Sequence, residues 1–174
     1  MYAYEKTILS TYHQTEAFLK STRLAMQKGV YASFYSRKPA VDLVEEIIDL
    51  KLQFEEIEEL KNAIDQALEE MKKCYAFILK VKYEIGEGKD AQVKKDAIYY
   101  RMIAYALGKF VLSMRKRGFT GEVLKEIIDK YCYLKSAYEQ ISNFENKVKS
   151  RGYLKHKGKS LKDKKVGENA FKRG

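Results

Sequence analysis

The feature that most restricts the fold of this chain is a helical repeat of apolar residues. From Pro39 to about Met71 the apolar residues step by three or four positions throughout, and strand-like alternation of apolar and polar residues is sustained nowhere in the sequence. Proline, which interrupts helices, occurs once. The repeat consists of Ile47, Leu50, Phe54, Ile57, Leu60, Ile64, Leu68 and Met71. The sequence therefore predicts an all-α fold built around one long amphipathic helix.

The same periodicity predicts four further helices. They cover about Tyr4 to Lys28, Lys72 to Tyr83, Lys94 to Lys116, and Gly121 to about Lys149. The first is expected to end near Gly29, residues 85–90 form a glycine-rich turn, and Thr120 caps the last helix. The steps of three and four suit an antiparallel hairpin or a short coiled coil of the long helix, either with the first helix or with a second copy of the chain. Packing within one chain gives a helical bundle.

Composition divides the chain into a folded part and a basic tail. Its 174 residues fit one domain, and 45% hydrophobic with 13% aromatic residues is too much for a disordered chain. After Arg151 the apolar residues are isolated and the lysines closely spaced. We therefore expect a helical domain over residues 1–150 and a disordered, flexible basic tail over residues 151–174.

The net charge of +10 is distributed unevenly along the chain. Residues 39–73 contain 4 basic and 11 acidic side chains, residues 74–117 contain 10 basic and 4 acidic ones, and residues 151–174 contain 9 basic and 2 acidic ones. One interpretation is that the acidic block is the solvated face of the long helix. The alternative is that it covers the basic block until nucleic acid displaces it.

The sequence offers no converging set of catalytic or metal-binding residues. His13 and His156 are the only histidines, and no HExxH, GxSxG, phosphate-binding loop or nucleotide fingerprint is present. The glutamates of residues 55–59 lack the Glu-x-x-His spacing of di-iron helices. Cys74 and Cys132 stand alone and are expected to be reduced, buried thiols. We therefore expect no enzymatic activity, no cofactor and no bound metal.

The sequence also lacks the signals that direct a chain to a membrane. The first residues have neither the basic start nor the uninterrupted apolar run of a signal peptide. No apolar stretch approaches the roughly 20 residues that cross a bilayer. A cytoplasmic location without membrane contact is therefore expected.

Part of the chain resembles a known bacterial family. The acidic long helix is followed by a short helix ending Leu79-Lys-Val-Lys-Tyr83, a glycine-bearing turn, and the run Asp96-Ala-Ile-Tyr-Tyr-Arg-Met-Ile-Ala-Tyr-Ala-Leu-Gly-Lys-Phe110. Over roughly residues 60–115 this order resembles region four of RNA polymerase sigma factors, above all the short sigma-like proteins of Gram-positive bacteria and their mobile elements. The family's middle helix has no counterpart, since Glu87 to Val93 is short and polar.

The resemblance implies a helix-turn-helix-like unit over about residues 67–117. In that unit Ala67-Leu-Glu-Glu-Met71 opens the motif, and residues 96–101 begin the recognition helix with Asp96 as its cap. The implied function is that of a DNA-binding transcription regulator or sigma-like accessory protein. Alternatives are an RNA-binding adaptor, or a helical interaction protein that holds a protein partner or a second copy through the 39–73 helix without sequence-specific DNA binding.

A recognition helix in a major groove presents its first residues to the bases while lysines contact phosphates. The tail adds salt-sensitive attraction that does not depend on sequence. The predicted DNA-binding residues are Lys94, Lys95, Tyr100, Arg101, Tyr105, Arg115, Lys116, Arg117, Lys157, Lys159, Lys164 and Lys165. For Tyr100 and Tyr105, burial in the core is the alternative.

Overall fold

The computed structural model describes residues 2–33, 35, 38–89 and 91–148, and every regular element in them is helical. The predicted all-α class is therefore confirmed. The helices are α1 (Ala3–Ser10), α2 (Tyr12–Ser33), α3 (Ala40–Glu69), α4 (Lys73–Tyr83), the short 3-10 helix η1 (Gly86–Gly88), α5 (Ala97–Lys116) and α6 (Gly121–Lys130). Residues 132–148 form a further helix. The predicted tail, residues 151–174, lies outside the described residues.

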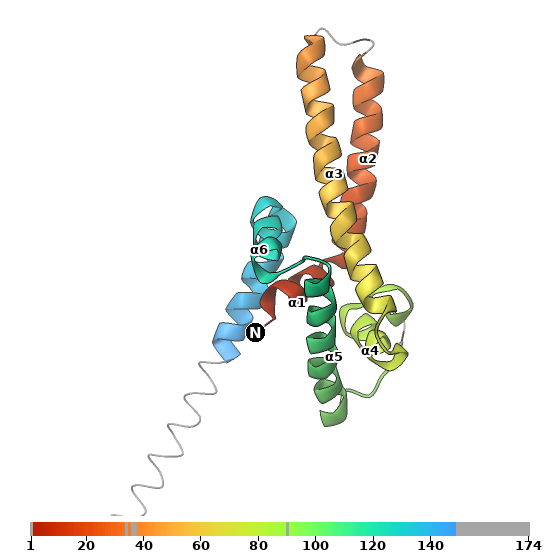
Figure 1. Ribbon diagram of the computed structural model, residues 1–174, viewed down its shortest axis with the longest axis vertical. Coiled ribbons are helices and arrows are strands. Elements are labelled where there is room, and N and C mark those ends of the chain that lie inside the picture. The colour runs from red at the N-terminus through yellow and green to blue at the C-terminus, as the bar shows by residue number, and fades with distance from the viewer. Residues whose placement is uncertain (1, 34, 36–37, 90, 149–174) are drawn as a thin grey trace, which may run out of the picture.

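Helices α2 and α3 form an antiparallel hairpin that extends as an arm from the rest of the molecule (Figure 1). At 30 residues, α3 is about 45 Å long. The two helices approach closely where a small residue faces an aliphatic one: a Cβ on Gly29 would lie 3.4 Å from Ile47 Cγ1. Of the predicted alternatives, the long helix therefore pairs with the first part of its own chain.

The second half of α3, from about Ile57 to Leu68, lies in the hydrophobic core. There it meets α1, α4, α5, α6 and the 132–148 helix, and each element contributes side chains without solvent contact. The largest are Ile8, Leu9, Ile57, Leu60, Ile64, Leu79, Phe110, Met114, Leu124, Ile128 and Leu134. The long helix is thus part of both the arm and the core, which joins the two parts through a continuous backbone.

Two of the predicted helices are each divided in the structure. The first breaks at Thr11, whose buried hydroxyl donates to the Thr7 carbonyl oxygen at 2.8 Å, a bond that bends helices. Its second part, α2, continues through Gly29 to Ser33. The last predicted helix breaks at Tyr131, which is extended at φ −107° and ψ 116°. Its hydroxyl donates to Glu56 Oε2 at 2.5 Å, so a contact with α3 holds the break.

Side-chain burial differs from prediction at a few positions. Cys74 and Cys132, expected to be buried thiols, are both exposed. Val123 and Phe144, apolar residues of the helix predicted from Gly121 to about Lys149, are also exposed. Each lies beside a helix start or in the last turns of the described chain, where few neighbouring elements are available to cover a side chain.

Candidate nucleic-acid interface

The first half of α5 projects beyond the core at the end of the molecule opposite the arm (Figure 1). Its second half is the anchor, with Ala106, Leu107, Phe110, Val111 and Met114 buried. Between residues 97 and 105, by contrast, Tyr99 is the single buried residue. The helix is therefore held at one end and presents most sides of the other end to solvent.

A tightly packed loop fixes where α5 begins. Gly88 of η1 lies so close to α4 that an added Cβ would be 2.2 Å from the Lys80 carbonyl carbon, so only glycine fits. Glu84 and Gly86 have positive φ angles of 56° and 50°, which turn the chain back along α4. The loop from Glu84 to Asp96 is longer than the three- to four-residue turn of a typical helix-turn-helix.

The start of α5 is capped as the sequence predicts. Asp96 Oδ1 accepts from the Tyr99 backbone N–H at 2.9 Å. The helix begins at Ala97, so Lys94 and Lys95 lie in the non-helical segment before it and not on its first turn. Both lysines are exposed, and they border the projecting end of α5.

The exposed face of α5 combines basic and apolar side chains. Steps of three, four and seven place Ile98, Arg101, Tyr105, Leu112 and Lys116 along one side of the helix, opposite the buried residues, and all five are exposed. From residue 94 to residue 117 the chain carries seven basic side chains and one acidic one. The acidic one is the cap, so this face is positively charged.

The two tyrosines predicted at the interface lie at the surface. Tyr100 and Tyr105 are each more than half exposed. The Tyr105 ring lies 5.0 Å from the Tyr75 ring of α4, and Lys109 Nζ is 5.3 Å from the Tyr105 centroid. These contacts orient the ring without covering it, so the alternative of burial in the core does not apply to either tyrosine.

Arg117 differs from the other predicted basic residues. Its guanidinium forms an ion pair with Glu70 and donates to the Ser113 hydroxyl at 2.6 Å and the Ser113 carbonyl at 3.0 Å. The hydrogen bond from Arg117 holds the pKa of the Glu70 carboxyl below its usual value. Arg117 therefore joins the end of α5 to the end of α3. Arg115 and Lys116 remain exposed, and the predicted tail residues Lys157, Lys159, Lys164 and Lys165 lie outside the described residues.

Several exposed residues of this surface were not among the predicted contacts. Ile98, Lys109 and Leu112 lie on the same face of α5, and Lys72 and Lys73 are exposed at the start of α4. The signal for Ile98 and Leu112 was present in the sequence, because both fall on the side of the helix opposite Phe110. Single exposed apolar residues are common on protein surfaces, so these two mark a contact surface only together with the basic side chains beside them.

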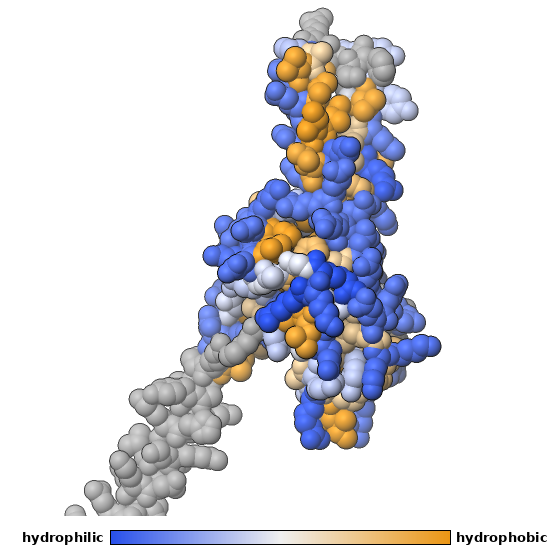
Figure 2. Space-filling model, in the orientation of Figure 1, coloured by the Kyte–Doolittle hydropathy of each residue, from blue (hydrophilic) through white to orange (hydrophobic). Residues whose placement is uncertain are grey.

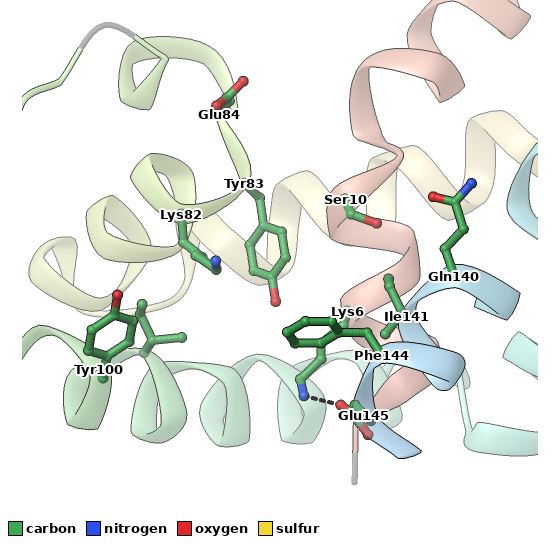
Figure 3. A pocket seen from close by; sticks show the side chains of 11 residues that line it. Lys6, Ser10, Lys82, Tyr83, Glu84, Tyr100, Gln140, Ile141, Phe144 and Glu145 are labelled. Atoms are coloured by element: carbon green, nitrogen blue, oxygen red, sulfur yellow. Dashed lines mark hydrogen bonds and ion pairs between the residues drawn. The ribbon is translucent and has the colours of Figure 1, made fainter. Parts of the chain in front are cut away.

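A groove of about 680 Å³ lies beside this surface, between α1, α5, the end of α4 and the 132–148 helix (Figure 3). Its walls include Tyr83, Ile103, Ile141 and Phe144, and Tyr100 lines one end. Lys6 pairs with Glu145 across it. Burial, with the nearby Glu145 charge, raises the pKa of Tyr83 to about 12, so this phenol stays neutral at physiological pH. The groove is mainly apolar and ends at the interface.

Comparison with models of protein families, with curated protein sequences and with solved structures found no match to this chain. Among the described residues, no group of His, Cys, Asp and Glu side chains is arranged to hold a metal ion. No helix in that part of the chain is long and apolar enough to cross a membrane.

Proposed function

We propose that this protein binds double-stranded DNA through the projecting half of α5 and acts in the bacterial cytoplasm as a transcription regulator or sigma-like accessory protein. The observation that carries the proposal is the combination of projection and charge. A helix anchored by its second half exposes its first half, and residues 94–105 there carry three basic side chains, Lys94, Lys95 and Arg101, and one acidic side chain, the cap Asp96. Lys109, Arg115 and Lys116 are exposed farther along the helix. The major groove of DNA is about 12 Å wide and admits one α-helix of this kind.

The exposed residues suit different parts of the DNA. Arg101 lies in the second turn of α5, where its guanidinium can donate two hydrogen bonds to a guanine edge. Ile98 offers an apolar contact of the type that thymine methyl groups accept. Lys94, Lys95 and Lys116 lie at the two ends of the exposed face, where they suit phosphates on either side of a groove.

Selection of bound sequences from a random duplex library tests the proposal. The full chain is expected to enrich a sequence family, and Arg101→Ala is expected to lose preference at one or two adjacent base pairs because its contact is to a base edge. Lys20→Ala is the matched control, since it removes one positive charge from an exposed site on the arm. Absence of enrichment by the wild type, or identical enrichment by Arg101→Ala, contradicts groove reading.

A further inference from the structure

The outer half of α3 carries a second apolar face. Val41, Val44, Ile48 and Leu52 follow one another at steps of three and four, so they form one stripe along the helix, and each is between 50% and 66% exposed. Figure 2 shows apolar side chains in a column along the arm. We call these four residues the outer stripe.

The outer stripe is not the face by which α3 packs on α2. That face consists of Leu43, Ile47, Leu50 and Phe54, which are buried or half-buried. At 100° per residue, the outer stripe lies on roughly the opposite side of α3. Because apolar helix faces are normally buried, a helix with apolar residues on two opposite sides is expected to pack against another element on each side. In the described part of the chain, α2 supplies one of those contacts and no element supplies the other.

Acidic residues border the outer stripe. Asp42, Glu45 and Asp49 are exposed along one edge of it, and none forms an ion pair with any other described residue. From residue 38 to residue 52 the chain has four acidic and two basic side chains. The two lysines already pair with glutamates, Lys38 with Glu46 at 2.7 Å and Lys51 with Glu55 at 3.6 Å.

A second copy of the chain does not suit this surface. When two antiparallel helices are related by a twofold axis, each edge faces the same edge of its partner, so the three carboxylates would face their own copies. Parallel pairing still brings together two segments, residues 38–52 of each copy, that have four acidic and two basic side chains each.

We propose that the outer stripe and its acidic edge dock an amphipathic helix of another protein, one that carries Lys or Arg beside its apolar residues. The aliphatic side chains supply most of the affinity, because exposed ion pairs each contribute little. The carboxylates select the charge and orientation of the incoming helix. The arm and the projecting end of α5 lie at opposite ends of the molecule, so the docked helix leaves the basic surface free (Figure 1).

Two synthetic helical peptides, each of about three heptads with leucine at the a and d positions, serve as probes. One has lysine at the flanking e and g positions and the other has glutamate there. Binding of each labelled peptide to the full chain is measured by fluorescence anisotropy at several salt concentrations. The lysine peptide is expected to bind at least about tenfold more tightly than the glutamate peptide, with a preference that decreases as salt increases.

Matched variants locate the binding surface. Val44→Gln combined with Ile48→Gln is expected to weaken binding of the lysine peptide by about tenfold or more. Leu24→Gln combined with Val148→Gln replaces equally exposed apolar residues elsewhere and is expected to leave binding unchanged. Asp42→Asn, Glu45→Gln and Asp49→Asn together are expected to remove most of the preference for the lysine peptide.

Several results overturn the proposal. Equal binding of both peptides, or no effect of the outer-stripe variant, shows that the surface does not select a basic helix. A dimer of the free chain that Val44→Gln and Ile48→Gln convert to a monomer identifies a second copy as the occupant. Tighter peptide binding after Lys157, Lys159, Lys164 and Lys165 are changed to Gln identifies the chain's own basic C-terminal segment as the occupant.

Discussion

The outer end of α3, in the arm, and the first half of α5 both extend past the core (Figure 1), and the segments that contain them are opposite in charge. Residues 38–52, which include the outer end of α3, have four acidic and two basic side chains, whereas residues 94–117, which include α5, have one acidic and seven basic ones. Both expose apolar residues in addition to charges. The net charge of +10 therefore includes an acidic surface on α3 and a basic surface on α5, which suit partners of opposite charge.

The two helices also differ in how the rest of the molecule supports them. Helix α5 is anchored by large buried side chains in its second half, while the outer end of α3, residues 40–52, is supported by α2 alone. The buried apolar residues in the second half of α5 therefore stabilise the fold. The exposed apolar residues of the outer stripe are instead available to contact a partner. The following predictions test that division.

The largest expected effect is on the anchor of α5. Phe110 has no solvent contact, and Phe110→Ala is expected to lower the free energy of unfolding by about 3–5 kcal/mol because it leaves a cavity. Ile48→Ala on the outer stripe is expected to change it by less than about 0.5 kcal/mol, since the side chain is half exposed. Urea denaturation measures both. A large loss for Ile48→Ala would show that the outer stripe is part of the core.

The next effect is on DNA affinity. Reversing two charges with Lys94→Glu and Arg101→Glu is expected to weaken binding to a duplex by about 100-fold at low salt, because the new carboxylates repel the phosphates that the basic side chains attract. Lys20→Glu combined with Lys28→Glu changes the net charge equally at exposed sites on the arm. Anisotropy titrations are expected to show a change of only about threefold for this control. Equal losses of affinity in the two variants would mean that net charge, and not the α5 surface, governs binding.

A smaller effect is expected from the cap of α5. Asp96→Ala removes the 2.9 Å bond from the Tyr99 backbone N–H and is expected to cost about 1 kcal/mol of unfolding free energy. Asp96→Asn keeps an acceptor and is expected to lose only a few tenths of that amount. Thermal denaturation of the two variants compares them. If Asn is as destabilising as Ala, the carboxylate does more than cap the helix.

The smallest effect is a pH dependence where α5 meets α3. The hydrogen bond from Arg117 lowers the pKa of Glu70 from its usual 4.5, so the charged carboxylate is favoured in the folded state. Its contribution is present above pH 4.5 and disappears as the pH falls through the lowered pKa. Glu70→Gln is therefore expected to lower Tm by about 2 °C or less at pH 7, with a smaller difference below pH 4. A difference that grows in acid contradicts this assignment.

The sequence predicted the elements whose apolar residues follow one regular face. The second half of α5 and the second half of α3 are buried where their periodicity indicates, because one core covers each face. Asp96 and Thr120 cap helices as predicted, since capping depends on residues only three positions apart. The outer stripe was missed because the long helix was interpreted as having a single apolar face.

The divided helices were beyond prediction for a different reason. Neither Thr11 nor Tyr131 is a proline or glycine, so no local signal marks a break. At the second break, the extended Tyr131 bonds through its hydroxyl to Glu56, a residue 75 positions earlier on α3. That contact exists only once the chain is folded. Likewise, the basic residues near α5 can be counted from the sequence, but the pairing of Arg117 with Glu70 cannot be inferred from it.

The salt dependence of DNA binding tests the central claim most directly. For the wild-type chain and for Lys94→Gln with Arg101→Gln, the logarithm of the association constant is measured against the logarithm of salt concentration. If both residues approach DNA at the projecting end of α5, the affinity is expected to fall, and the slope is expected to become shallower by about 0.9 for the phosphate that Lys94 no longer neutralises. An unchanged slope and affinity would show that DNA is bound elsewhere on the chain and would contradict the proposed interface.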